Sequence, residues 1–328
     1  MPHVLVAGKL HPAGISLLDQ AAGVTYDYVE EVSEPSYAHL IDKADGLVIR
    51  TQPLSAPTVE KAGRLRIVSR HGVGYDSVDL PSLNKRGITL AVVGDVNSIS
   101  VAEHAMMMLL ACAKRAVRGD RSVREAAWNW RNRLEASELA GKRLLILGYG
   151  RIGRHLAKMA AAFSMEVAAY DPFLEKIGWP EGPTKAVSDL ASALQWADAI
   201  SVHAPKGDVP VIGERELSLM KPGVWLVNTA RGGVVDEKAL IAALESGKVA
   251  AAGLDVFDEE PPAPDNPLLS CDQVILSPHI AGLTIECGER MAVSAVQNVL
   301  DFFESRIDPT LVVNGKELDG QRPLLESH

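Results

Sequence analysis

The stretch KRLLILGYGRIG, residues 142–153, decides the fold of this 328-residue chain. An apolar run leads directly into the pattern G-x-G-x-x-G, and residues of helical character, Arg154–Phe163, follow it. A strand that turns through glycines into a helix is typical of a dinucleotide-binding unit. Gly148 permits the tight turn, Gly150 lets backbone amides approach a pyrophosphate, and Gly153 allows helix and strand to pack closely. The stretch therefore predicts a dinucleotide site.

An acidic residue, Asp171, ends the next apolar run, 18 residues after Gly153. A carboxylate at this place accepts hydrogen bonds from the adenosine ribose hydroxyls and repels a 2′-phosphate. The sequence therefore predicts NAD rather than NADP as the cofactor. A glycine turn without a ligand is the alternative, which the combination of strand, helix and acidic residue disfavours.

Short runs rich in Val, Ile and Leu alternate with longer stretches of helical period, as in parallel sheets wrapped by helices. The first series of predicted strands is Val4–Ala7, Thr25–Val29, Leu47–Arg50, Arg66–Ser69 and Thr89–Val93. The second series is Arg143–Leu147, Val167–Tyr170, Ala199–His203, Trp225–Asn228, Ala252–Asp255 and Val274–Leu276. The predicted fold class is α/β, with two Rossmann-like, doubly wound parallel-sheet domains.

The chain is longer than a single core usually allows, so two domains are expected. A long helix that Ser98 or Ser100 caps is predicted to leave the first series, and Thr284 opens an amphipathic stretch long enough to return to it. The polar residues after Gly315 are predicted to form a loosely held tail. The expected domains are a discontinuous substrate-binding domain, residues 1–98 plus 287–328, and a cofactor domain, residues 99–286.

The composition excludes several classes of protein. Hydrophobic residues make up 47% of the chain and charged residues 23%, as in a globular protein with a packed core. A net charge of −9 without a dense basic stretch argues against a nucleic-acid partner. No apolar run reaches the roughly 18 residues of a membrane span. Cys112, Cys271 and Cys287 show neither metal-site nor CxxC spacing, which predicts no metal and reduced thiols in a cytoplasmic protein.

Three ionisable residues follow strands of the second series, where open α/β sheets place their ligands: Arg231, Glu260 and His279. The planar guanidinium of Arg231 matches a carboxylate and the neighbouring carbonyl of a 2-oxo acid. Reduction of a ketone requires a hydride, a proton donor for the oxygen and a cation for the acid group. Each residue alone is ordinary, but together with a nicotinamide site they predict the reduction of a 2-oxo acid.

A second glycine run, His71–Gly74, follows a predicted strand but leads into no long helix. Its backbone amides form a small concavity for an anion, which suits a substrate carboxylate, with Arg70 and His71 adding charge or donors. A tight turn without a ligand is the alternative.

Six ordered motifs make the chain resemble the D-isomer-specific 2-hydroxyacid dehydrogenase family over nearly its whole length. They are HGVGYDSVDL (71–80), NSISVAEH (97–104), GKRLLILGYGRIG (141–153), NTARGGVVDE (228–237), LDVFDEEPP (254–262) and SPHIAG (277–282). The resemblance implies an NAD-dependent oxidoreductase with its active site in the cleft between the domains, and a homodimer built largely through the NAD domains. A short form of the family, without the regulatory domain of longer members, is expected.

Carried over by position, the resemblance implies Arg231 as the catalytic arginine, Glu260 as the glutamate and His279 as the acid/base. The implied substrate loop is Val73 and Gly74, with Asn97 at the domain crossing. The implied NAD contacts are Gly150, Arg151, Ile152, Asp171, His203, Pro205, Ala230 and Asp255.

These residues give a hypothesis for the mechanism. NADH delivers hydride to C2 of a short 2-oxo acid, while His279 protonates the oxygen and Glu260 holds the imidazole and favours its protonated form. A substrate of 3-phosphoglycerate, hydroxypyruvate or glyoxylate type is expected, and the sequence leaves the choice open. The alternative from another class is a corepressor-like protein that senses NAD(H) on the same fold.

Overall fold

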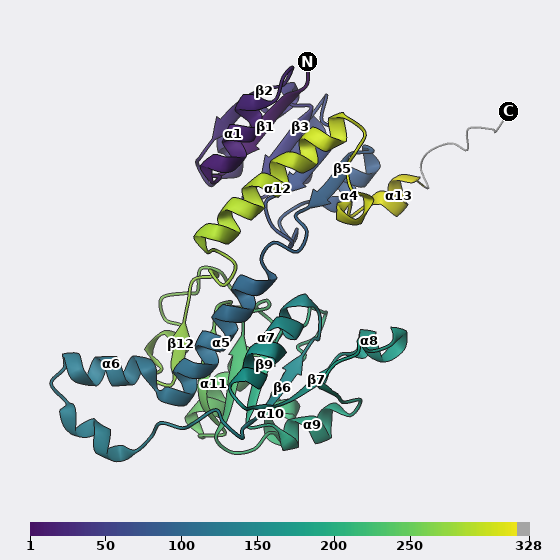
Figure 1. The fold of residues 1–328 in the computed structure, drawn as a ribbon. Helices are drawn as coiled ribbons and strands as arrows, with labels where there is room; N and C mark the ends of the chain where they lie inside the picture. The colour runs from purple at the N-terminus through teal and green to yellow at the C-terminus, as the bar shows by residue number, and fades with distance from the viewer. Residues whose placement is uncertain (320–328) are drawn as a thin grey trace. The chain divides into compact units, whose positions relative to one another are not determined.

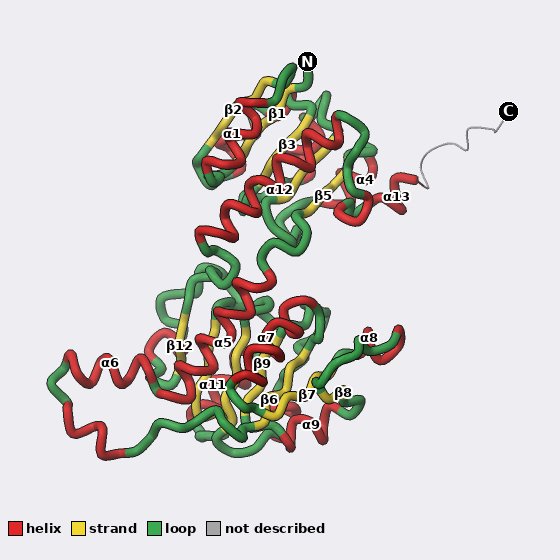
Figure 2. The backbone as a smooth tube through the Cα atoms, viewed as in Figure 1, coloured by secondary structure: helices red, strands yellow, loops and turns green. Residues whose placement is uncertain are grey.

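The computed structural model describes residues 1–319, which form two units of parallel sheet covered by helices (Figures 1 and 2). Unit 1 comprises Met1–Asn97 and the segment that begins at Thr284, and unit 2 comprises Ser98–Leu283. The predicted α/β class with two parallel sheets is confirmed.

Unit 1 contains a parallel sheet with the strand order β2-β1-β3-β4-β5. Its strands are β1 (His3–Ala7), β2 (Thr25–Val29), β3 (Gly46–Ile49), β4 (Ile67–Arg70) and β5 (Thr89–Val92). Its helices are α1 (Pro12–Gln20), α2 (Glu34–Ala38), α3 (Ala56–Lys61), α4 (Leu80–Lys85), α12 (Ile285–Phe303) and α13 (Gly315–Asp319), with 3-10 turns η1 (Ile41–Lys43) and η4 (Pro309–Leu311).

Alternate residues of each central strand enter different cores, because successive side chains of a strand point to opposite faces. Val4 and Val6 of β1 pack in one cluster with α12 residues such as Met291. Leu5, between them, packs in the other cluster with Tyr37 of α2. As predicted, Thr284 stands at the start of α12. It caps the helix, because its hydroxyl accepts a hydrogen bond from Cys287 N.

The segment that directly precedes the predicted tail is anchored to unit 1. Asn314 is fully buried, and its amide group donates to Ile88 O at 2.9 Å while its oxygen accepts Leu90 N at 2.8 Å. This polar anchor ties the chain to β5, and α13 follows directly. Residues 320–328 of the predicted tail lie outside the described residues.

Unit 2 contains a parallel sheet with the strand order β12-β11-β10-β9-β6-β7-β8. Its strands are β6 (Arg143–Leu147), β7 (Glu166–Tyr170), β8 (Lys185–Ala186), β9 (Ala199–Val202), β10 (Val224–Asn228), β11 (Val249–Leu254) and β12 (Val274–Leu276). Its helices are α5 (Ser98–Lys114), α6 (Ala116–Arg124), α7 (Arg151–Ala162), α8 (Pro172–Ile177), α9 (Leu190–Trp196), α10 (Glu214–Leu219) and α11 (Glu237–Glu245), with 3-10 turns η2 (Trp128–Arg133) and η3 (Pro267–Ser270).

Both faces of this sheet are buried, as expected for parallel strands. Leu144 and Ile146 of β6 pack in a cluster with residues of α5 and α7. Leu145 and Leu147 pack on the opposite face with residues of α9, α10 and α11 (Figure 1). The continuous apolar run that identified β6 in the sequence therefore reflects burial on two sides.

The predicted long helix is present as α5. It ends at Lys114, because Arg115 adopts a left-handed conformation with φ +52° and α6 starts anew after it. Two local details differ from the sequence prediction. Helix α7 begins at Arg151, three residues earlier than predicted, directly on the glycine turn. The two-residue strand β8 has no apolar run to mark it, since both of its residues are exposed at the edge of the sheet.

The strand order places the reversal of the chain between β6 and β9. Strand β6 pairs with β7 on one side and with β9 on the other, so the connections leave these neighbours in opposite directions. Ligands of open α/β sheets bind at such a switch point, outside the carboxyl ends of the strands. The loops after β6, β9, β10, β11 and β12 all leave from this edge of the unit 2 sheet.

Candidate active site

The glycine turn between β6 and α7 is crowded at two glycines and open at the third. Gly148 has φ +92°, and a Cβ there would lie 2.7 Å from the His203 carbonyl. A Cβ at Gly153 would lie 2.4 Å from the Gly148 oxygen, so the helix packs tightly under the turn. At Gly150 an added Cβ meets no described atom within 4 Å. The turn thus leaves open space where the N-terminus of α7 presents its amides without a side-chain cap.

Asp171 follows β7 and its carboxylate lies against the glycine turn. One oxygen accepts Tyr149 N at 2.8 Å, and the other accepts Phe173 N at 3.0 Å and Leu174 N at 3.1 Å. The carboxylate therefore caps α8 and fixes its own position beside the turn. The oxygen bonded to Tyr149 keeps capacity for a further donor.

His203 follows β9, on the other side of the switch point. Its amide donates to Leu147 O at 2.7 Å, and its Nε2 lies 2.9 Å from the Ser201 hydroxyl. Burial lowers the pKa of His203 to about 4, so the imidazole is neutral near neutral pH. The buried His203 Nδ1 and the buried Thr229 Oγ1 have no hydrogen-bond partner among the described residues. Polar atoms of this kind at a sheet edge fit a polar ligand.

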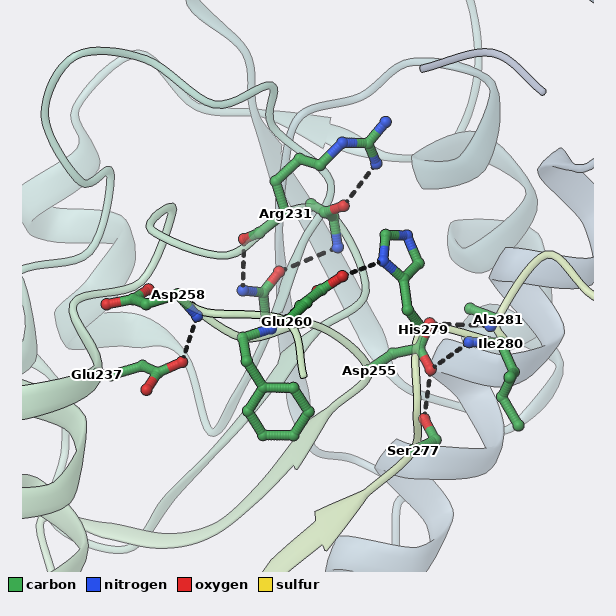
Figure 3. A network of polar contacts seen from close by, with 12 residues as sticks. Arg231, Glu237, Asp255, Asp258, Glu260, Ser277, His279, Ile280 and Ala281 are labelled. Atoms are coloured by element: carbon green, nitrogen blue, oxygen red, sulfur yellow. Dashed lines mark hydrogen bonds and ion pairs between the residues drawn. The ribbon is translucent and has the colours of Figure 1, made fainter. Parts of the chain in front are cut away.

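Arg231 lies in the loop after β10, which the side chain of Asn228 shapes. The Asn228 amide donates to Arg231 O at 3.0 Å, and its oxygen accepts Ala230 N at 3.0 Å. A Cβ at Gly232 would lie 1.7 Å from Phe257 O, so this loop packs directly against the loop after β11. Figure 3 shows the Arg231 side chain extending on the side of the site where the His279 ring lies.

Glu260 and His279 come from the loops after β11 and β12, and the structure brings them into contact. His279 Nδ1 and Glu260 Oε2 are 2.7 Å apart (Figure 3). The other oxygen, Oε1, accepts Phe257 N at 3.1 Å, which orients the carboxylate. The side chains are 50% and 36% exposed, so a ligand can reach the pair. An apolar cavity of about 400 Å³, lined by Phe257, Pro261, Pro262, Leu269 and Leu276 among others, adjoins it.

The other predicted cofactor residues lie along the same edge of the unit 2 sheet. Arg151 and Ile152 are the first residues of α7, and Pro205 and Ala230 lie in the loops after β9 and β10. Asp255, by contrast, is only 1% exposed. Its carboxylate accepts Ser277 Oγ at 2.5 Å, Ile280 N at 2.9 Å and Ala281 N at 2.8 Å (Figure 3).

Sequence reasoning missed the residues that fix these loops. Ser277 bridges Asp255 and His104 of α5, whose Nε2 lies 2.9 Å from the Ser277 oxygen. Glu237, the first residue of α11, accepts Asp258 N at 2.5 Å and so holds the loop that carries Glu260. Ser277, His104 and Glu237 all lie within motifs that the sequence analysis quoted, and their place at motif ends was the available signal.

The predicted substrate residues Arg70, Val73, Gly74 and Asn97 belong to unit 1. Arg70 ends β4, and its guanidinium donates to the carbonyl of His71 at 2.6 Å. Val73 is exposed and Gly74 is partly exposed, whereas His71 and Gly72 are buried. His71 does not add the positive charge that the sequence analysis allowed, because burial, and then Arg50 and Arg70, lower its pKa to about 4.

The described part of the chain contains neither a metal-binding cluster nor a membrane-spanning helix. Within residues 1–319, no group of three His, Cys, Asp or Glu side chains is placed to hold a metal ion. The same residues include no helix with the length and apolar character that crossing a bilayer requires.

A parallel sheet with an open glycine turn at its switch point defines a dinucleotide-binding protein, and the comparisons with known proteins agree. Residues 106–281 match the D-isomer specific 2-hydroxyacid dehydrogenase, NAD binding domain. A D-3-phosphoglycerate dehydrogenase of Archaeoglobus fulgidus is 38% identical over 301 residues, which cover 91% of this chain and 56% of that protein. A glyoxylate reductase of Korarchaeum cryptofilum is 37% identical, with 95% and 96% covered. A solved structure of a Thermus thermophilus protein superposes with a TM-score of 0.86 at 32% identity, covering 95% and 99%.

The chain therefore belongs to the D-isomer specific 2-hydroxyacid dehydrogenase family, as its motifs predicted, and its cofactor is NAD. It spans about half the length of the phosphoglycerate dehydrogenases that it matches and nearly the whole length of the glyoxylate reductase. The open space at Gly150 and the buried, unsatisfied atoms of His203 and Thr229 fit a dinucleotide at the switch point.

Proposed function

We propose that this chain is an NAD-dependent oxidoreductase that interconverts a short 2-oxo acid and its D-2-hydroxy acid. The observation that carries the proposal is the 2.7 Å contact between His279 Nδ1 and Glu260 Oε2 at the edge of an NAD-binding sheet. A carboxylate only accepts hydrogen bonds, so the Nδ1 nitrogen carries a proton and Nε2 is left to exchange a proton with a substrate.

The chain's own residues then divide the reaction between them. Bound NADH supplies the hydride that reaches C2 of the 2-oxo acid. His279 donates the Nε2 proton to the carbonyl oxygen as that oxygen becomes a hydroxyl, and it takes the proton back in the oxidative direction. Glu260 holds the imidazole ring and offsets its positive charge. Arg231 binds the substrate carboxylate with its planar fork and polarises the carbonyl.

The cofactor is proposed to lie along the carboxyl edge of the unit 2 sheet. The amides around Gly150 and Arg151 bind the pyrophosphate, and Asp171 accepts the ribose hydroxyls. Asp255 has about one of its four acceptor positions left for a ligand. The remaining proposed contacts are Gly148, Ile152, Gly153, His203, Pro205 and Ala230.

Substrate binding in unit 1 is proposed for the glycine run and its neighbours, Arg70, Val73, Gly74 and Asn97. A substrate of glyoxylate, hydroxypyruvate or 3-phosphoglycerate type fits this proposal. Phosphate needs more positive charge than a hydroxymethyl group, and Arg50, whose charge acts on His71 together with that of Arg70, is one candidate of unit 1 to supply it. The ratio of turnover with a phosphorylated and an unphosphorylated 2-oxo acid, measured before and after Arg50→Gln, separates these substrates.

The decisive experiment is NADH oxidation by the purified chain with glyoxylate, hydroxypyruvate and 3-phosphohydroxypyruvate, followed by chiral analysis of the product. We expect turnover of at least one of them to the D-2-hydroxy acid, lost in His279→Ala. Binding of NADH without turnover of any 2-oxo acid would refute the enzyme and favour a sensor of the cofactor.

We further propose that the protein is a cytoplasmic homodimer built through residues 99–286. The mass in solution, measured by light scattering during size-exclusion chromatography, tests the dimer. A monomer at micromolar concentration contradicts it.

A further inference from the structure

The loop that carries His279 has a backbone conformation that must be held in place. His279 has φ +54°, in the left-handed region that residues with a side chain rarely adopt. Such a conformation persists only where the surrounding structure fixes it. The hydrogen bonds of the loop identify what fixes it.

Asp255 receives four hydrogen bonds from this loop. Its carboxylate accepts the Ser277 hydroxyl, Ile280 N and Ala281 N, and its backbone oxygen accepts His279 N at 2.9 Å. The carboxylate is 1% exposed, so these donors replace the water that a buried charge requires. The loop thus wraps around a buried charge, and three of the four bonds come from consecutive amides, residues 279–281.

Ser277 links this arrangement to helix α5. A hydroxyl has one proton, and at 2.5 Å the Ser277 hydroxyl donates it in a hydrogen bond to the Asp255 carboxylate. The Ser277 oxygen is therefore an acceptor toward His104 Nε2 at 2.9 Å, and His104 carries a proton on that nitrogen. The same nitrogen lies 3.7 Å from Asp255 Oδ1, and the His104 side chain is only 15% exposed.

We propose that His104 is a positioning residue for the reaction: through its Nε2–H it orients the Ser277 hydroxyl onto Asp255 and so holds the loop that presents His279. This inference rests on the proposed function, because it concerns the placement of the proton donor. His104 does not touch the reacting atoms in this assignment, and it acts through Ser277 and the buried carboxylate.

Removing the His104 donor leaves the Ser277 oxygen with one partner fewer inside a half-buried site. The Ser277 hydroxyl is then free to turn away, and Asp255 loses one of the hydrogen bonds that offset the cost of burying its charge. The amides of residues 279–281 are expected to open more often. A displacement of His279 by about 1 Å is enough to lower turnover about a hundredfold. The binding of NADH, whose proposed contacts lie mostly at the glycine turn, should change less.

Two amide variants form a matched pair. In His104→Gln the side-chain nitrogen occupies nearly the position of Nε2, and in His104→Asn the same amide is too short to reach Ser277. The first readout is hydrogen exchange of the amides of Ile280 and Ala281 in the protein without cofactor or substrate. We expect faster exchange in His104→Asn, with near-normal exchange in His104→Gln.

The second readout is kinetic. For the 2-oxo acid that the wild-type chain turns over best, kcat is expected to fall about tenfold to a hundredfold in His104→Asn and to recover in His104→Gln. The Kd for NADH is expected to change less than kcat in both, because most of the proposed cofactor contacts lie at the glycine turn and only Asp255 belongs to this network. Ser277→Ala should lower kcat similarly, and adding His104→Asn to it should cost little more, because both act on one bond. Ser270→Ala, which removes an exposed hydroxyl at the end of η3, is the control.

The exchange and kinetic measurements test the positioning role of His104 and the proposed function separately. Equal exchange of Ile280 and Ala281 in His104→Asn and the wild type overturns the positioning role, whatever the activity. Fully additive losses in the His104→Asn, Ser277→Ala double variant overturn it as well, since the two residues then act independently. Absence of turnover in the wild type with every 2-oxo acid refutes the proposed function alone, and the exchange result still decides the role of His104.

Discussion

Each unit contains a histidine whose pKa is lowered to about 4 by burial of its ring, and a loss of stability in acid follows from this. His71 of unit 1 is 6% exposed, and burial, followed by the charges of Arg50 and Arg70, disfavours its protonated form. In the unfolded chain the same imidazole titrates near pH 6.5. The unfolded state therefore binds a proton at this residue between pH 6.5 and about 4 that the folded state does not bind.

The sign and size of the effect follow from that difference. Above pH 6.5 both states are neutral at His71, and its contribution to the free energy of unfolding is complete. As the pH falls toward 4, the unfolded state is increasingly favoured. Between the two pKa values, each pH unit below the unfolded pKa lowers the free energy of unfolding by about 1.4 kcal/mol. At pH ~5, His71 alone should therefore lower it by about 2 kcal/mol.

The assay is urea unfolding of the wild-type chain and of His71→Leu, each at about pH 8 and about pH 5. Leucine cannot titrate, so the loss of stability on acidification should be smaller in His71→Leu by about 2 kcal/mol. This double difference is insensitive to packing changes, because they affect the variant equally at both pH values. His203 contributes its own loss to both proteins and cancels.

The matched control is His39→Leu, which replaces an exposed histidine of the same unit. We expect this variant to keep the acid dependence of the wild type. The reasoning fails if His71→Leu loses as much stability as the wild type between the two pH values, since burial then does not keep the imidazole neutral.

Three further predictions concern the site itself. Glu260→Gln retains the size of the side chain but loses the charge-assisted bond to His279, so the pH range of efficient reduction should move downward; an unchanged rate profile for NADH oxidation argues against this role. Arg231→Lys keeps the charge but loses the planar fork, so kcat/KM for the 2-oxo acid should fall about a hundredfold or more, and a near-normal value rejects the substrate contact. Asp171→Ser keeps an oxygen to cap α8 but removes the negative charge, so the ratio of kcat/KM with NADPH to that with NADH should rise about tenfold, measured with one substrate; a constant ratio assigns discrimination elsewhere.

The fold was predictable wherever one physical cause dominates the sequence. Strand β6 is apolar at every central position because helices cover both of its faces, and the glycine pattern follows because the turn has no room for side chains at Gly148. The break at Arg115 was not predictable in this way. A left-handed residue between two helices leaves no mark in a pattern of apolar and polar residues, since the sequence on both sides favours helix.

The identity of the site residues was predictable from the sequence, but the contacts that hold them in place were not. Arg231, Glu260 and His279 stand out because ionisable residues follow apolar strands, and the structure brings the last two into contact. Their geometry depends on partners such as Glu237 and Ser277, which are ordinary surface-type residues in sequence. Only the topology of the sheet, which sets the loops after neighbouring strands side by side, gives these residues their significance.

Asp255 shows why a motif does not specify a role. In sequence it is an acidic residue at the end of a strand, which is equally consistent with a cofactor contact and with a structural anchor. The structure adds that the carboxylate is buried and accepts three hydrogen bonds from the His279 loop, so a charge that costs much to bury is retained where it fixes a strained backbone. A substitution such as Asp255→Asn turns one acceptor oxygen into a donor facing an amide. It should therefore disturb the loop before it disturbs any ligand, and hydrogen exchange without NAD distinguishes the two effects.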